Sequence, residues 1–522
     1  MKKWSWLLAG LVFIAGTIRL IKTDFPITLN EAKENYTAFT LLKTGGLPLS
    51  FPTDNDFISP LAVYLRVPVV AAFGLTYFSN HLPAIIFGAL SLILIYLVTK
   101  NLFASAIFAV LPFVIQTNIF SLELSAALCF YLLAWYARVS KKTKTFYISL
   151  ILGALSSATF VPIALVLLYL KHVNKISWLI ILLFGLLVFN LTPGYRNYFI
   201  RTTMVKNMLP KNFAYIIERR ISVGFTEGSP LKINTSNLSR LAFNKPYFIL
   251  NGLFTALVKP FDYETLTSVT EAGYILDKTP RTTIQLPKFF FWEIPFLIIA
   301  LLSLIKSDRN LKLLVVGALV SSFLFGVSGL IFLTPLIAMA YAQGLKKISG
   351  IKTAVVVAFI LFMNYVVLFD LLWNHPPKWI DENSLRQQQI WNTISPSDTQ
   401  NNMVTVTDRL GSPAYYYLYY HKVDPAEFLR NHEIGKAISD DTTPFIRIGN
   451  VKFYSFKLYE SDRKPNQIWV GLPGEMVGSN RKYSEDDTVS DGVIYKRIVD
   501  IKQNDPFVGS ELWFVKTKFD KI

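Results

Sequence analysis

Apolar runs long enough to cross a lipid bilayer recur through the first 373 residues, and they leave few folds open to this chain. A bilayer core of about 30 Å requires about 20 apolar residues in helical form, because every backbone polar group inside it must be hydrogen-bonded. The runs extend over Trp4 to Ile21, Leu82 to Thr99, Phe103 to Gln116, Leu124 to Ala137, Phe146 to Leu170, Ile176 to Leu191, Phe289 to Ile305, Leu311 to Phe325, Leu330 to Leu345 and Thr353 to Trp373. With 52% hydrophobic and only 17% charged residues among 522, the sequence predicts a polytopic α-helical membrane protein.

Short basic clusters separate these runs and indicate their orientation. The clusters are Lys2 with Lys3, Lys100, Arg138 with Lys141, Lys142 and Lys144, Lys171 with Lys175, Lys306 with Arg309 and Lys312, and Lys346, Lys347 with Lys352. Loops rich in Lys and Arg remain in the cytoplasm. All the clusters can lie in the cytoplasm only if the segment from Phe146 to Leu170 crosses the membrane twice, as two short helices broken near Ser156, Ser157 and Pro162. The result is about eleven spans in the cell membrane, with a cytoplasmic N-terminus and the C-terminal part on the outer side.

Charge, the N-terminus and cysteine content each exclude one class of protein. The basic clusters account for much of the net charge of +17, and no basic module interleaved with aromatic residues is visible, so we expect no nucleic-acid partner. Two lysines followed by an apolar run, as at Lys2 and Lys3, are also typical of a cleaved signal peptide. Nothing after Gly16 is typical of a cleavage site, so we predict that this segment is retained as a first transmembrane helix. The single cysteine, Cys129, excludes an intramolecular disulfide framework.

The chain divides into two predicted domains. Residues 1–373 form the membrane domain, with outer segments at Lys22 to His81 and Thr192 to Lys288, and residues 374–522 have ordinary polar content. Alternating patterns in the second part predict strands at Met403 to Thr407, Phe445 to Ile448, Val451 to Phe456, Gln467 to Val470, Gly492 to Ile498 and Leu512 to Thr517. We therefore predict a small extracytoplasmic soluble α/β domain, and we expect function where the outer segments meet the membrane.

The segment after the first apolar run places a carboxylate at the outer membrane surface. Ala32, Tyr36 and Phe39 recur at helical spacing, which predicts an amphipathic helix against the membrane or the helix bundle. Glu31 lies in the first turn, three residues after Thr28. This spacing fits a capping box, in which the Glu bonds back to the cap amide, and it also fits a catalytic carboxylate. The residues alone leave both interpretations open.

A second carboxylate, Glu123, lies at the outer end of the predicted span from Leu124 to Ala137. Ser121 could cap that helix, and an acid in its first turn suits the helix dipole. Two carboxylates at one outer face can equally form an acid–base or cation-holding pair. The outer cations that could hold a lipid phosphate, or simply lie among lipid headgroups, are Arg66, Arg219, Arg220, Arg240 and Lys245.

The sequence contains no glycine-rich phosphate loop, no Ser-His-Asp order and no Cys/His metal spacing. We therefore predict no metal site and no cofactor, while the need for a divalent cation is left open.

In order and spacing, these motifs resemble the GT-C superfamily of polytopic glycosyltransferases, specifically the bacterial dolichyl-phosphate-mannose-protein mannosyltransferase-like branch, which includes the aminoarabinose lipid A transferases. The matching residues are Asn30 to Ala32, Tyr36, Leu41 to Gly45, Asn55 to Pro68, Phe73 to Leu75, His81 to Gly88, Ile119 to Ser125 and the tail from Leu410 to Tyr420. The resemblance implies a GT-C-like membrane fold and transfer of a sugar from a polyprenyl-phosphate donor to a glycan, lipid or protein acceptor.

This sequence departs from the family pattern at three positions that bear on the chemistry. The family's first-loop Asp, its expected general base, corresponds to Asn30, which cannot accept a proton at neutral pH. The family's donor-phosphate Lys corresponds to Ile58, and the Arg ahead of its Phe-Glu pair corresponds to Ile119. The residues retained are Glu31, Asp56, Pro60, Tyr64 and Glu123.

Two hypotheses follow for the outer face. The first is an inverting glycosyltransferase in which Glu31 replaces the missing Asp as base, Glu123 and Asp56 orient the acceptor or a cation, and Arg66 or the pair Arg219 and Arg220 faces the phosphate. By the resemblance, Tyr36, Pro60 and Tyr64 would help to bind substrate. The second is a non-catalytic GT-C-like protein that binds lipid-linked sugar or scaffolds an active paralogue. A transporter ranks last, because no charged residue is visible in the middle of a span.

Overall fold

The computed structural model describes residues 27–46, 58–171, 309–345, 359, 362–364, 382–408, 413–434, 445–454, 467–471, 488–489, 493–497 and 513–517. Several sequence predictions lie outside these residues: Asp56, Arg219, Arg220, Arg240, Lys245, the apolar runs Trp4 to Ile21, Ile176 to Leu191 and Phe289 to Ile305, and most of Thr353 to Trp373. The predicted number of spans is therefore not tested.

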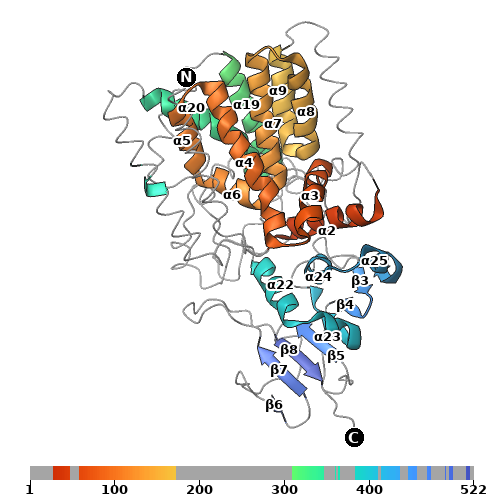
Figure 1. Ribbon diagram of the computed structural model, residues 1–522. Helices are drawn as coiled ribbons and strands as arrows, with labels where there is room; N and C mark the ends of the chain where they lie inside the picture. The colour runs from red at the N-terminus through yellow and green to blue at the C-terminus, as the bar shows by residue number, and fades with distance from the viewer. Residues whose placement is uncertain are drawn as a thin grey trace, which may run out of the picture.

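A bundle of apolar helices forms the first part of the described fold (Figure 1). Its elements are α3 (Pro60–Phe73), α4 (Tyr77–Thr99), α5 (Leu102–Val110), α6 (Pro112–Phe120), α7 (Leu122–Val139), α8 (Thr143–Ser156), η1 (Ala158–Phe160), α9 (Val161–Lys171), α19 (Arg309–Phe325), η4 (Gly326–Leu333) and α20 (Thr334–Leu345). Among the described residues, α4 and α7 are long and apolar enough to cross a membrane, and the bent pair formed by α5 and α6 is a third such segment if it counts as one span. These helices support a location in the membrane.

Proline explains why the predicted run from Phe103 to Gln116 is two helices. The bend between α5 and α6 is 66°. Leu111 has an extended backbone, and Pro112 is the first residue of α6. A residue before proline avoids the helical conformation, and proline donates no backbone hydrogen bond, so the helix must break here.

The predicted break within Phe146 to Leu170 is confirmed. Ser157 has an extended backbone between α8 and η1, and its side chain accepts a hydrogen bond from the amide of Thr159. After the one turn of η1, α9 begins at Val161 and packs beside α8 (Figure 1).

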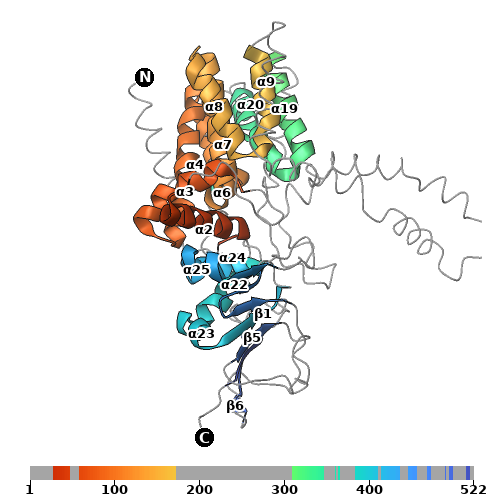
Figure 2. The same ribbon diagram turned by 90° about the vertical axis from the view of Figure 1, so that its right-hand side faces the viewer.

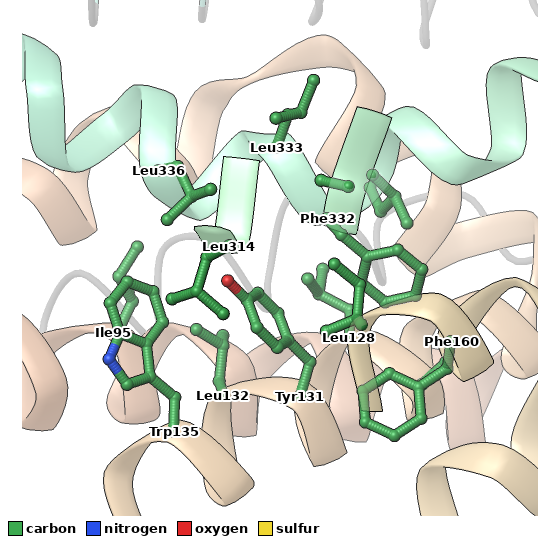
Figure 3. Close-up of a cluster of buried hydrophobic side chains, with 14 of the residues drawn as sticks. Ile95, Leu128, Tyr131, Leu132, Trp135, Phe160, Leu314, Phe332, Leu333 and Leu336 are labelled. Atoms are coloured by element: carbon green, nitrogen blue, oxygen red, sulfur yellow. The ribbon is translucent and has the colours of Figure 1, made fainter. Parts of the chain in front are cut away.

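Large side chains from α7, η1 and η4 fill the centre of the bundle (Figure 3). The ring centroid of Tyr131 lies 5.8 Å from that of Trp135. It also lies 5.8 Å from the ring centroid of Phe332, which it meets edge to face. Phe160 packs 5.9 Å from Phe332. Burial of these rings attaches the short η1 segment to the long helix α7.

Basic residues gather at one end of the bundle. The guanidinium of Arg138, at the end of α7, donates to the carbonyl of Leu170 near the end of α9. The ammonium group of Lys171 lies 4.5 Å from the ring centroid of Phe146 at the start of α8. Lys100 caps the C-terminal end of α4, a helix of 23 residues, and so lies far from the start of that helix. The beginnings of α4, α7 and α9 and the end of α8 therefore lie at the opposite end.

The second part of the fold is a mixed eight-stranded sheet with short helices, in the strand order β2-β3-β4-β1-β5-β8-β7-β6. The strands are β1 (Met403–Val406), β2 (His432–Ile434), β3 (Phe445–Ile448), β4 (Val451–Phe453), β5 (Gln467–Gly471), β6 (Thr488–Val489), β7 (Val493–Arg497) and β8 (Trp513–Thr517), and the helices are α22 (Glu382–Thr393), α23 (Pro396–Asn401), α24 (Pro413–Tyr420) and α25 (Pro425–Asn431). Over the residues that the structure describes, a strand is present in each of the six predicted segments, although β4 ends at Phe453. The edge strands β2 and β6 were not predicted.

We call the eight-stranded sheet with its helices α22, α23, α24 and α25 the sheet domain. Helix α2 (Leu29–Thr44) lies between the bundle and the sheet domain (Figures 1 and 2). One hydrophobic core includes Ala32 and Tyr36 of α2 together with Trp391 and Tyr417 of the C-terminal part. The hydroxyl of Tyr36 donates to the carbonyl of Val423 at 3.1 Å. The predicted helix is present, but it is not a simple amphipathic helix on a surface, because it is covered from two sides and buries polar as well as apolar residues.

Gly153 tests the packing of α8 against η1. A Cβ atom at this position would overlap the ring of Phe160, which is fully buried. We expect Gly153→Ala to lower the free energy of unfolding by about 1 to 3 kcal/mol, because the core cannot accommodate the added methyl group. Thermal unfolding of the purified protein in detergent measures this effect.

Phe160→Leu supplies the control for this prediction. The double variant Gly153→Ala, Phe160→Leu should be more stable than the sum of the two single effects, because the smaller side chain leaves room for the methyl group. Additive losses would show that the two residues do not compete for this space.

Candidate functional site

Three carboxylates converge at the end of the bundle opposite the basic residues. Glu31 and Glu34 come from α2, and Glu123 comes from the first turn of α7. Glu34 interacts electrostatically with both of the others. The guanidinium of Arg66 pairs with Glu34. We call Glu31, Glu34, Glu123 and Arg66 the acid cluster.

Glu31 has a structural task within this cluster. Its Oε2 atom accepts hydrogen bonds from the Thr28 amide at 2.9 Å and from the Thr28 hydroxyl at 3.0 Å. The Thr28 hydroxyl in turn accepts from the Glu31 amide, so the capping box is complete. The other oxygen, Oε1, lies 3.4 Å from Nδ1 of His81. The capping interpretation is therefore confirmed, and the side chain is only 3% exposed.

Glu34 and Arg66 form a buried ion pair. The carboxylate accepts from Nε of Arg66 at 2.9 Å and lies 2.8 Å from Nη2. Nη1 of Arg66 donates to the backbone and side-chain oxygens of Asn80 at 2.6 and 2.9 Å. Asn35 donates both to the Asn80 side chain and to the carbonyl of Glu31. This network ties α2, α3 and α4 together through groups that are almost fully buried.

Burial raises the pKa of Glu34, and the attraction of Arg66 opposes that rise. The charge of Glu31 raises the pKa of Glu34 further. Desolvation is the largest of these effects, since a charged carboxylate loses its water on burial. Arg66 therefore compensates only part of the cost of placing a carboxylate here.

Glu123 differs from the other two carboxylates because it is partly exposed. Its Oε1 atom accepts a hydrogen bond of 2.5 Å from the hydroxyl of Ser157. That hydroxyl lies 2.8 Å from the hydroxyl of Thr159. Ser121 caps α7 through the Leu124 amide, so the cap does not require Glu123. The break between α8 and η1 thus brings a hydroxyl to a carboxylate that solvent can reach.

The remaining predicted residues separate into several environments. Asn30 is exposed, whereas Ile58 and Ile119 are buried. Pro60 is buried as the first residue of α3, and Tyr64 is partly exposed. Tyr36 packs against the sheet domain rather than into the acid cluster.

Arg66 also has surroundings other than those expected for a phosphate-facing cation. Its side chain is 1% exposed, and the acceptors of its guanidinium are Glu34 and Asn80. A lipid phosphate would have to displace these buried partners to reach it.

Three residues of the site are not predicted from the sequence: Glu34, Asn80 and His81. Glu34 lies one turn after Glu31, so it shares a helix face with that residue, and this spacing was the available signal. Nothing in the sequence links Asn80 or His81 to α2, because their positions depend on the crossing of α2, α3 and α4. Nδ1 of His81 also lies 3.0 Å from the carbonyl of Ile119. Within the described residues, no group of three or more His, Cys, Asp or Glu side chains is arranged to hold a metal ion.

No protein-family model and no curated protein sequence matches this chain. Among solved structures, it is similar to ArnT from Cupriavidus metallidurans in the apo state, with a TM-score of 0.40 and 11% identity over 81% of this chain and 84% of that chain. The same protein bound to undecaprenyl phosphate gives a TM-score of 0.39 and 10% identity over 81% of this chain and 85% of that chain. The chain is also similar to the archaeal oligosaccharyltransferase AglB from Archaeoglobus fulgidus, in complex with an inhibitory peptide and a dolichol-phosphate. Here the TM-score is 0.40 and the sequence identity is 14%, over 80% of this chain and 63% of that chain.

The ion pair between Glu34 and Arg66 predicts a stability change that depends on pH. Arg66→Met leaves Glu34 buried without its partner, which should lower the free energy of unfolding by about 3 to 5 kcal/mol at neutral pH. Without Arg66 the folded-state pKa of Glu34 lies still higher, so stability is lost as pH rises from about 4.3, the usual pKa of a Glu, toward that raised value. Thermal unfolding midpoints at a series of pH values measure the loss.

The double variant Arg66→Met, Glu34→Leu is the control for this prediction. It should recover most of the stability lost by Arg66→Met and should lack the added pH dependence, because no unpaired charge remains. A destabilisation by Arg66→Met that is equal at all pH values would contradict the account of Glu34.

Proposed function

We propose that this chain is a membrane glycosyltransferase that transfers a sugar from a polyprenyl-phosphate donor to an acceptor on the outer face. The observation that carries the proposal is the acid cluster at the end of the bundle, in which three carboxylates lie within electrostatic reach of one another and one of them, Glu34, pairs with the guanidinium of Arg66. Buried like charges are costly, and stability alone would favour apolar residues in their place. A cluster of this kind is a candidate for proton transfer.

The placement of the cluster supports an outer site. Basic residues of α4, α7 and α9 lie at the other end of the same bundle, and such residues favour the cytoplasmic side. The acid cluster would then face the cell exterior, as would the sheet domain that lies beyond α2. This orientation also agrees with the motif resemblance, which locates the chemistry in the first outer segment.

Among the three carboxylates, the geometry favours Glu123 as the general base. Glu31 was the first choice from sequence, but its Oε2 atom is engaged in the capping box. Glu34 is engaged by Arg66. Glu123 has a hydroxyl as its hydrogen-bond partner and is partly exposed, so an acceptor can approach it. Glu31 and Glu34 then contribute negative charge and fix the helices around Glu123.

The proposed reaction is a single displacement at the anomeric carbon of the sugar. The acceptor hydroxyl oxygen forms the new bond to that carbon while its proton passes to Glu123. The bond from the anomeric carbon to the phosphate oxygen breaks, and the polyprenyl phosphate leaves with the electron pair. Because Arg66 is paired with Glu34, we assign the phosphate-facing charge to Arg219 or Arg220, and Asp56 keeps its proposed role of orienting the acceptor or a cation.

Full-length protein in nanodiscs allows a direct test with a panel of radiolabelled undecaprenyl-phosphate sugars. We expect transfer by the wild type and a loss of about 100-fold to 10,000-fold in kcat for Glu123→Gln, because the amide cannot take the proton. Glu31→Gln should retain most activity, since Gln also completes a capping box. Glu427→Gln, on the exposed surface of α25, is the matched control.

Other outcomes have distinct meanings. If Glu31→Gln abolishes transfer and Glu123→Gln does not, the base is Glu31. If the wild type binds undecaprenyl phosphate but transfers sugar only after Asn30→Asp, the protein is a non-catalytic binder with a degenerate site. Failure of the wild type to bind undecaprenyl phosphate would overturn the proposal.

A further inference from the structure

Helix α24 carries a run of tyrosines, and the hydroxyl of Tyr419 is one of the buried hydroxyls that lack a hydrogen-bond partner among the described residues. Tyr416 exchanges a hydrogen bond of 2.9 Å with the hydroxyl of Ser384, which ties α24 to α22. Tyr419 is equally buried, at 3% exposure, yet its hydroxyl has no hydrogen-bond partner among the described residues. A buried hydroxyl without a partner costs about 1 to 3 kcal/mol. A Phe would fill the same space without that cost.

The Tyr419 hydroxyl lies within electrostatic reach of the acid cluster. The charged groups that act on it are Glu31 and Arg66, together with the phenol of Tyr77 at the start of α4. The C-terminal part of the chain therefore places a polar group near the members of the acid cluster that come from α2 and α3. Burial raises the pKa of Tyr419, so its hydroxyl remains protonated and can donate a hydrogen bond.

The charge of the surroundings restricts what that hydroxyl can bind. The guanidinium of Arg66 is already engaged by Glu34 and Asn80, so it is not available to pair with a phosphate. A sugar hydroxyl is neutral and both donates and accepts, which suits a phenol and carboxylates together.

We propose that Tyr419 is a substrate-positioning residue, whose hydroxyl bonds a hydroxyl of the transferred sugar and makes the C-terminal domain part of the site. The inference rests on the proposed function and adds to it a residue distant in sequence. Glu31, Arg66 and Tyr419 are almost fully buried. The proposal therefore requires α24 to shift away from α2 when the sugar binds.

The test compares the wild type with Tyr419→Phe and with the matched control Tyr416→Phe, each as full-length protein in nanodiscs. Thermal unfolding midpoints are measured without ligand, with undecaprenyl phosphate, and with undecaprenyl-phosphate mannose, glucose or galactose. Without ligand, Tyr419→Phe should be as stable as the wild type or more so, whereas Tyr416→Phe should be less stable. With a sugar-bearing lipid, Tyr419→Phe should lose the stabilisation that depends on the sugar, which corresponds to about tenfold weaker binding. Tyr416→Phe should keep it.

Each contrary result has a separate meaning. If Tyr419→Phe keeps the full sugar-dependent stabilisation, or loses stability without ligand as Tyr416→Phe does, Tyr419 is structural and the inference is overturned alone. If the wild type itself shows no stabilisation by any of the sugar-bearing lipids beyond that of undecaprenyl phosphate, the proposed function is overturned together with it.

Discussion

The buried ion pair between Glu34 and Arg66 is the constraint on which the site depends. It joins α2 to α3, and the bonds from Arg66 to Asn80 extend the connection to α4. A buried pair of this kind adds little net stability, but it fixes one arrangement, because either charge alone would be costly inside the protein. Helix α2 is therefore held on the bundle in the register in which Glu34 meets Arg66, and that register determines where Glu31 lies relative to Glu123.

Helix α2 also explains why the two parts of the chain are not independent. Glu34, on one side of α2, pairs with Arg66 of the bundle. Tyr36, on another side, packs in the core that α2 shares with the sheet domain. The cation of Lys33 lies 5.0 Å from the ring centroid of Tyr415 in α24. A movement of the sheet domain would thus act on α2, and through α2 on the acid cluster. Through α2, the bundle and the sheet domain are therefore mechanically connected at the acid cluster.

The sequence predicted the parts of the site that depend on local pattern. The helix after Thr28, the strands of the sheet domain and the break at Ser157 each follow from spacing or from turn-forming residues. The capping box was foreseen for the same reason, as one of two open interpretations of Glu31. The partners of Arg66 were not foreseen, because a charged residue in an apolar helix has the same local pattern whether it meets a phosphate or a carboxylate.

By itself, the sequence determined that this chain enters a membrane, where its basic clusters lie relative to its apolar runs, and which carboxylates stand at helix ends. Hydrophobicity and charge along the chain decide these features, since they depend on the residue and its near neighbours. Only the tertiary structure decided that Glu31 is engaged in its cap, that Glu34 needs Arg66, and that Glu123 faces Ser157 with solvent access. These roles arise from contacts between helices distant in sequence, and burial then sets the energetic cost of each charge.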